Sequence, residues 1–136
     1  MKPRHAQMYM EMAEVAAKNS YATRLKVGAI AVKDHRIVSV GYNGTAPGRD
    51  NNCEGSDGLT KSEVIHAETN LIYKLARDGQ SGAGADLFVT HSPCMNCSLA
   101  ILSVGFRKVW FRNQYRDLSG VEFLRENGIE VDQLCE

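Results

Sequence analysis

Cys94 and Cys97 stand three residues apart in the run HSPCMNC, directly after Pro93. Such a pair can bind a metal ion, form a redox couple or fill a core, and two thiolates supply only half of the four ligands that zinc takes. A proline suits the first position of a helix, so we expect Ser92 to cap a helix whose first turn holds both sulfurs on one face. A fold that completes a zinc site must therefore bring further ligands to this helix end.

The composition is that of an ordinary globular protein, with 43% apolar and 24% charged residues among 136. This length predicts a single domain over residues 1–136. The formal charge is zero, with 16 Lys+Arg against 16 Asp+Glu, and there is no basic stripe. We therefore expect a small-molecule substrate and no nucleic-acid partner.

The amino-terminal run MKPRHAQMYMEMAEVAAK carries charges throughout and lacks the apolar core of a signal peptide. No apolar run in the sequence approaches the length that spans a bilayer. These features predict a cytoplasmic protein without a membrane partner. In that compartment the four cysteines are expected to be metal ligands or free thiols.

Hydrophobic periodicity predicts an alternation of helices and strands. The expected elements are a helix over Arg4–Asn19, two strands in VGAIAVKDHRIVSVGYN that turn at Asp34-His35, a long loop over Ala46–Ser62, a helix in EVIHAETNLIYKLARDG, a strand in DLFVTH, a helix over Cys94–Val104, a strand in RKVWF, a helix with a Ser119–Glu122 capping box that ends at Asn127-Gly128, and a short strand in IEVDQL. This order predicts an α/β fold, namely a three-layer α/β/α sandwich with a central mixed five-stranded sheet. A long loop in so small a domain is usually functional.

The run HAE, residues 66–68, supplies what the cysteine pair lacks. The imidazole of His66 and the two sulfurs give three protein ligands and leave a fourth position for water, as in catalytic zinc sites. Two thiolates leave zinc little net charge to acidify that water, so Glu68 is the expected base that takes its proton. A capping box of Thr60 and Glu63 would put His66 inside a helix, where residues two apart point to nearly opposite faces. We therefore expect the helix to start close to His66.

H-x-E followed by P-C-x-x-C is the known signature of zinc nucleobase deaminases, and this chain matches it. The main alternative is a closed structural zinc site with Cys53 as its fourth ligand, which would make the chain a non-catalytic zinc module. That reading leaves Glu68 without a task. We expect Cys53 to be a free thiol of the long loop.

The chain as a whole resembles the deoxycytidylate (dCMP) deaminases of the cytidine deaminase-like superfamily. The resemblance runs from about Tyr21 to Gly128 and includes TRLKVGAIAV, GYNG, HAETN, VTHSPCMNC and YRD. It implies hydrolysis of dCMP to dUMP and ammonia, in which water attacks C4 of cytosine. Glu68 would protonate N3 and then the departing amine. It also implies the cytoplasm of a bacterium or of a virus-infected host cell.

The resemblance further assigns roles to individual residues. It implies that His66, Cys94 and Cys97 hold Zn²⁺. Substrate contacts would come from Arg24 to the 5′-phosphate, Asn43 to the sugar hydroxyl, the Ala67 backbone to the base, and Tyr115 to the base or sugar. Lys26, Arg112 and Arg116 also lie near expected strand ends and stay open as phosphate ligands.

Regulation is implied as well: a hexamer activated by dCTP and inhibited by dTTP, with Mg²⁺ on the triphosphate. Gly41, Tyr42 and Gly44 of the GYNG turn, with Lys26, are the candidate effector contacts, and an ordinary strand-end turn is the alternative. Another possible function is that of an adenosine deaminase acting on transfer RNA, which shares both motifs. The neutral composition offers it little to hold RNA.

Overall fold

Helices and strands alternate along the chain as the periodicity predicts. The computed structural model describes residues 1–135, so Glu136, the last residue of the expected domain, lies outside the described residues. The elements are α1 (Pro3–Ala17), β1 (Gly28–Lys33), β2 (Arg36–Tyr42), α2 (Ala67–Arg77), β3 (Asp86–His91), α3 (Met95–Val104), β4 (Lys108–Asn113), α4 (Ser119–Glu126) and β5 (Glu130–Gln133). Among residues 1–135, no helix has the length and apolar character needed to cross a bilayer.

The strands form one mixed sheet of order β2-β1-β3-β4-β5. β1 is antiparallel to both β2 and β3, whereas β3, β4 and β5 run parallel. The β1–β2 hairpin turns at Asp34 and His35, both with positive φ (51° and 61°), as in a type I′ turn. The expected five-stranded mixed sheet is therefore confirmed.

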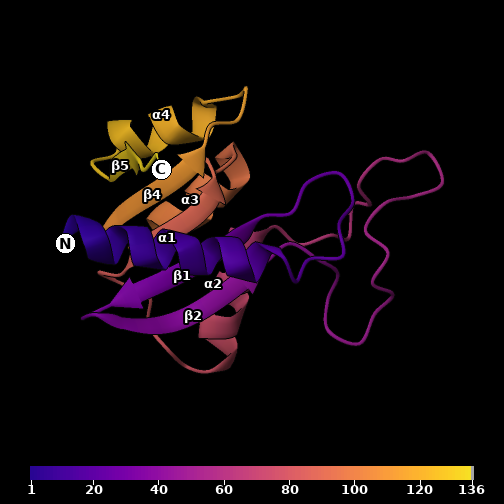
Figure 1. The fold of residues 1–136 in the computed structure, drawn as a ribbon, viewed down its shortest axis with the longest axis horizontal. Helices are drawn as coiled ribbons and strands as arrows, with labels where there is room; N and C mark the ends of the chain where they lie inside the picture. Colours follow the sequence, from indigo (N-terminus) through magenta and orange to yellow (C-terminus); the bar gives the residue numbers. More distant parts are fainter. Residues whose placement is uncertain (136) are drawn as a thin grey trace.

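Helices cover both faces of this sheet (Figure 1). Because successive strand residues point to opposite faces, each central strand contributes to two cores. Ile30 and Phe88 pack with residues of α1 on one face. Ala29, Leu87 and Val89 pack with residues of α2, α3 and α4 on the other. This arrangement is the predicted three-layer α/β/α sandwich.

Two helix ends differ from the prediction. α1 ends at Ala17 rather than at Asn19. The capping box at α4 is wrong, because the N-cap is Leu118 and makes no side-chain cap bond. The backbone N–H of Ser119 instead donates to Oδ1 of Asp117 (2.9 Å), so the residue expected to cap is the first residue of the helix.

The chemically reactive groups lie at one end of the sheet, where the parallel strands have their carboxyl ends. β3 and β4 are parallel and end there at His91 and Asn113, which are paired, and helices α2 and α3 begin beside them. Ligand sites of α/β sheets lie outside the carboxyl ends of parallel strands. The long loop between β2 and α2 projects from the same end of the sheet (Figure 1).

Candidate active site and metal centre

The start of α2 is set by its contacts with β2. His66 is the N-cap, with extended backbone (φ −66°, ψ 155°), so the helix begins at Ala67. Just before it, Ile65 pairs with Gly44 through N–H···O bonds of 3.1 and 2.8 Å in the two directions. Inside the first turn, Asn70 donates from Nδ2 to the carbonyl of Tyr42 (2.9 Å). The expectation that the helix starts close to His66 is confirmed.

Gly41 lets α2 rest directly on β2. A Cβ at this position would lie 2.3 Å from the carbonyl oxygen of Ala67 and 2.8 Å from the nitrogen of Leu71. Real Cβ atoms do not approach other atoms so closely, so any side chain here would push the helix away from the sheet. The position of the first turn of α2 therefore depends on this glycine.

The start of α3 differs from the prediction by one or two residues. Cys94 is itself the N-cap, and its sulfur accepts a hydrogen bond from the N–H of Cys97 (3.5 Å). Ser92, the expected cap, instead accepts from the N–H of Tyr115 (2.8 Å) after β4. Cys94 thus lies just before the first turn of α3, at the positive end of the helix dipole, where a thiolate is stabilised.

His66, Cys94 and Cys97 form one compact group. Their ligand atoms all lie within 4.8 Å of one another. Nδ1 of His66 is 3.6 Å from the sulfur of Cys94 and 3.4 Å from that of Cys97. With Zn–S bonds of about 2.3 Å and a Zn–N bond of about 2.0 Å, tetrahedral zinc separates such ligands by about 3.5 Å. The donor set and its spacing therefore fit zinc with three protein ligands.

The two sulfurs differ in their protonation. Hydrogen bonds from Cys97 and His66 lower the pKa of Cys94 to about 4. The pKa of Cys97 is raised far above its usual range, because the bond to Cys94 and burial both hold its proton. The pair as a whole therefore loses one proton readily and holds the second, which binding of zinc must displace.

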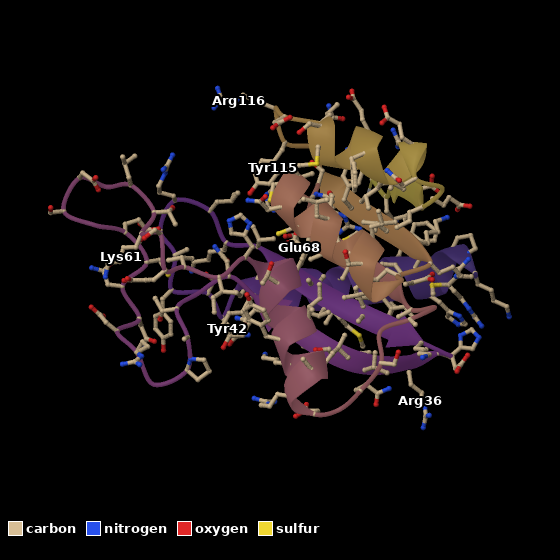
Figure 2. The ribbon with its side chains drawn as sticks, turned by 180° about the vertical axis from the view of Figure 1, so that it is seen from behind. Arg36, Tyr42, Lys61, Glu68, Tyr115 and Arg116 are labelled. Carbon is tan, nitrogen blue, oxygen red and sulfur yellow. The ribbon has the colours of Figure 1, made fainter. Side chains whose placement is uncertain are left out.

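Glu68 lies in the first turn of α2 next to this group and is only 5% exposed (Figure 2). Burial raises its pKa to about 7, which outweighs the effects of His66 and of hydrogen bonds that lower it. A carboxyl group with such a pKa both accepts and releases a proton near neutral pH. Glu68 therefore has the location and the pKa expected of the acid–base group of the site.

A pocket of about 590 Å³ opens onto the site. This volume suits a small-molecule ligand. Of the residues predicted from the sequence, it is lined by Arg24, Asn43, His66, Ala67, Glu68, Cys94 and Tyr115. Arg116, one of the further candidate phosphate ligands, also lines it, and Leu25, Val27, Thr60, Val64, His91 and Asp117 complete the lining. The predicted substrate-side residues are thus brought together at one pocket.

Arg112 and Arg116 looked equivalent in the sequence, yet they lie in different places. Arg112 is buried and donates to Glu14 and Gln7 of α1, so it is not a residue of the pocket. Arg116 is exposed and lines the pocket. The candidate effector residues Lys26, Gly41, Tyr42 and Gly44 are not among those that line it.

Asn43 connects the end of β2 to the segment before β1. Its Nδ2 donates to the carbonyl of Leu25 (2.8 Å), and its Oδ1 accepts from the N–H of Val27 (2.9 Å). One amide proton and one lone pair of the side chain are left over by these bonds. The residue therefore holds the pocket wall in place, and it retains capacity for a ligand hydroxyl.

His91 and the residues that precede α2 received little weight from the sequence. The ring centroid of His91 is 5.6 Å from that of Tyr115, and its Nδ1 lies 3.0 Å from Oγ1 of Thr90. Thr60 and Val64 belong to the segment directly before HAE. Their proximity in sequence to His66 was the signal that could have placed them in the pocket.

The closed zinc site with Cys53 is contradicted. Within residues 1–135, the group that could hold a metal ion contains His66, Cys94 and Cys97 and not Cys53. The Cys53 thiol is free, 1% exposed, and donates to the carbonyl of Asn51 (3.5 Å). It is a free loop thiol, as expected, but a buried one.

The chain is similar to known zinc-dependent deaminases. The model of the family described as "Cytidine and deoxycytidylate deaminase zinc-binding region" matches residues 3–113. A deoxycytidylate deaminase of Mycobacterium phage D29 is 34% identical over 122 residues, which cover 79% of this chain and 94% of that protein. ComE operon protein 2 of Bacillus subtilis (strain 168) is 32% identical over 133 residues, covering 94% and 70%.

A solved structure shares the whole fold. The dCMP deaminase of cyanophage S-TIM5, crystallised in complex with dCMP and dUMP, has a TM-score of 0.95 and 44% identity to this chain. The match covers 98% of each chain. Together with the match to the zinc-binding region and the His-Cys-Cys group found here, these similarities show that the chain belongs to the cytidine and deoxycytidylate deaminase family.

Proposed function

We propose that this protein is a zinc-dependent deoxycytidylate deaminase that hydrolyses dCMP to dUMP and ammonia. The observation that carries the proposal is the position of Glu68, buried beside three zinc-ligand donors at a pocket of nucleotide size. The similarity of the chain to deoxycytidylate deaminases, including one whose structure was solved with dCMP and dUMP, supports this choice of substrate.

The chain's own residues account for the proton transfers. Zinc held by His66, Cys94 and Cys97 would supply a water molecule of lowered pKa. Glu68 takes a proton from that water and delivers it to N3 of cytosine while the water oxygen bonds to C4. Glu68 then takes the remaining proton from the oxygen on C4 and delivers it to the C4 amine, which becomes a leaving group. The C4–N bond then breaks, ammonia departs, and C4 keeps the oxygen as the carbonyl of uracil.

Arg24 is the proposed ligand of the 5′-phosphate. Within residues 1–135, no hydrogen bond or ion pair occupies its guanidinium, and the residue is exposed at the pocket. Arg116, in the same situation, is a second candidate. Guanidinium groups form the strongest hydrogen bonds with phosphate oxygens. We propose further that Asn43 binds the sugar hydroxyl, that Tyr115 packs on the base or sugar, and that the Ala67 backbone contacts the base.

The test is the ultraviolet absorbance change on deamination of dCMP, measured for the zinc-loaded protein and for Glu68→Gln. Zinc content is determined for both, so that loss of activity cannot be attributed to loss of metal. Turnover by the wild type and its absence in a fully loaded Glu68→Gln variant are expected. A wild type that leaves dCMP unchanged but deaminates adenosine in transfer RNA would refute the proposed substrate.

We also propose the regulation that the resemblance implies: activation by dCTP, inhibition by dTTP, Mg²⁺ on the triphosphate, and a hexameric assembly. Gly41 and Tyr42 are the last residues of β2 rather than part of a turn, and Gly41 packs on α2, so Gly44 and the exposed Lys26 are the candidate effector contacts that stay accessible to a ligand. Since the N–H of Gly44 already donates to Ile65, side chains would have to supply most of that contact. Rates with each effector and Mg²⁺, and the mass in solution, test these proposals separately.

A further inference from the structure

Glu54, in the long loop between β2 and α2, is a buried carboxylate outside the catalytic group. It is 8% exposed. Its oxygens accept hydrogen bonds from the backbone N–H of Thr23 (3.3 and 3.2 Å), from the Thr23 hydroxyl (3.0 Å) and from the backbone N–H of Arg24 (3.4 Å). Donors from two adjacent residues thus converge on one side chain that lies 30 positions further along the chain.

These bonds explain how the carboxylate tolerates its surroundings. Within residues 1–135, Glu54 forms no ion pair, and a buried charge without compensation is costly. Burial acts to raise the pKa of Glu54. The hydrogen bonds from Thr23 and from the backbone of Arg24, together with the positive charge of Arg24, outweigh it and lower the pKa below its usual value. The group is therefore ionised at neutral pH, and each of its bonds is charge-assisted.

The segment that Glu54 binds is the one that carries Arg24 into the pocket. Asn43 also binds this segment, through the carbonyl of Leu25 and the N–H of Val27. The loop itself is closed near Glu54 by a bridge to Thr60, which also lines the pocket. The backbone of residues 23–27 is thus fixed between the end of β2 and the long loop, whereas the guanidinium of Arg24 stays exposed.

We infer that Glu54 is a positioning residue, whose carboxylate fixes the backbone of Thr23 and Arg24 so that the Arg24 guanidinium meets the phosphate of the substrate. The inference rests on the proposed function, because it needs a phosphorylated substrate at Arg24. It gives the long loop a task in catalysis: the loop carries the acceptor that orients a substrate ligand. Glu54 itself does not touch the substrate in this account.

The first test compares kcat/KM for dCMP and for deoxycytidine in Glu54→Ala. Loss of the charged acceptor is expected to lower the value for dCMP roughly 5- to 30-fold, mainly through KM, and to change that for deoxycytidine less than about twofold. Glu54→Gln keeps one acceptor oxygen and should fall between the two proteins. Equal losses on both substrates, or no loss on dCMP, would overturn the inference.

Asp57→Ala is the matched control in the same loop. The Asp57 carboxylate accepts from Leu59 within the loop and is exposed, so its removal should leave both substrates unaffected. In addition, Glu54→Ala should have no further effect on dCMP once Arg24 is replaced by Ala, because the positioned group is already gone. Independent, multiplicative losses in the double variant would contradict a role through Arg24.

Amide hydrogen exchange separates this inference from the proposed function. The N–H groups of Thr23 and Arg24 should exchange slowly in the zinc-loaded wild type, much faster in Glu54→Ala and at an intermediate rate in Glu54→Gln, whatever substrate the enzyme uses. Absence of dCMP turnover with this pattern would refute the proposed substrate and, with it, the catalytic part of the inference. Rapid exchange of both amides in the wild type would refute the positioning itself.

Discussion

Replacing Arg24 by Ala tests the phosphate contact that distinguishes a nucleotide substrate from a nucleoside. The guanidinium is exposed and forms no ion pair or hydrogen bond within residues 1–135, so its removal should leave folding intact. A hydrogen bond to a charged group contributes about 1.5–3 kcal/mol. The variant should therefore lose roughly 10- to 150-fold in kcat/KM for dCMP. Deoxycytidine, which has no phosphate, should be affected less than about twofold.

The assay is the initial rate of absorbance loss with each nucleotide and nucleoside. Arg36→Ala is the control for loss of one positive charge, since Arg36 begins β2 at the end of the sheet far from Glu68 (Figure 2). It should behave as the wild type. Arg116→Ala, measured in parallel, shows whether the second pocket arginine shares the phosphate. A loss for Arg24→Ala that is equal on dCMP and deoxycytidine would refute the assignment.

Three further predictions concern the metal, the packing and pH. Cys97→Ser should bind zinc much more weakly, and a chelator should lower its thermal unfolding midpoint less than that of the wild type, because little bound metal is left to remove. Gly41→Ala should reduce the free energy of unfolding in urea by about 1–3 kcal/mol, since its Cβ overlaps α2, whereas a Cβ at Gly44 meets no atom within 4 Å, so Gly44→Ala is the control. The pKa of Glu54 is lower in the folded protein than its usual 4.5, so it stabilises the folded state above pH 4.5 and this contribution is lost as pH falls through the folded pKa. The difference in thermal unfolding midpoint between the wild type and Glu54→Gln should therefore become smaller as the pH falls below 4.5.

The sequence predicted those features that depend on local periodicity and on motif chemistry. Short β-rich apolar runs predicted the strands. Because successive residues of a strand point to opposite faces, β3 contributes Phe88 to one core and Leu87 and Val89 to the other. The requirement that His66 and Glu68 serve one site overruled a capping box at Thr60, and the helix does begin where that chemistry demands. A functional constraint was here a better guide than a local cap signal.

The helix caps that failed did so because competing partners were available. Ser92 has the residue type of a cap, but its hydroxyl oxygen accepts a hydrogen bond from the N–H of Tyr115, 23 positions later in the chain. Cys94 then caps α3 with its sulfur. Ser119 lost its role to a nearer competitor, the Asp117 carboxylate. Of the two wrong caps, Ser92 and Ser119, only the error at Ser119 could have been foreseen from neighbouring residues, because Asp117 is two positions away.

Long-range polar contacts could not be read from the sequence. Arg112 and Arg116 both follow the core of an apolar strand, yet Arg112 is held by Glu14, 98 positions earlier, and only Arg116 reaches the pocket. The bond between Glu54 and Thr23 has no periodic signature, because it joins two irregular segments. The contacts of Arg112 and of Glu54 therefore required the structure.

The most direct test of the central claim is a zinc titration of the metal-free protein with turnover of dCMP measured at each step. Production of dUMP and ammonia in equal amounts is expected to rise with zinc until one ion is bound per chain. Glu68→Gln should bind the same zinc and produce neither. Turnover that is independent of zinc, or an unimpaired Glu68→Gln variant, would contradict the assignment of His66, Cys94, Cys97 and Glu68 to one catalytic site.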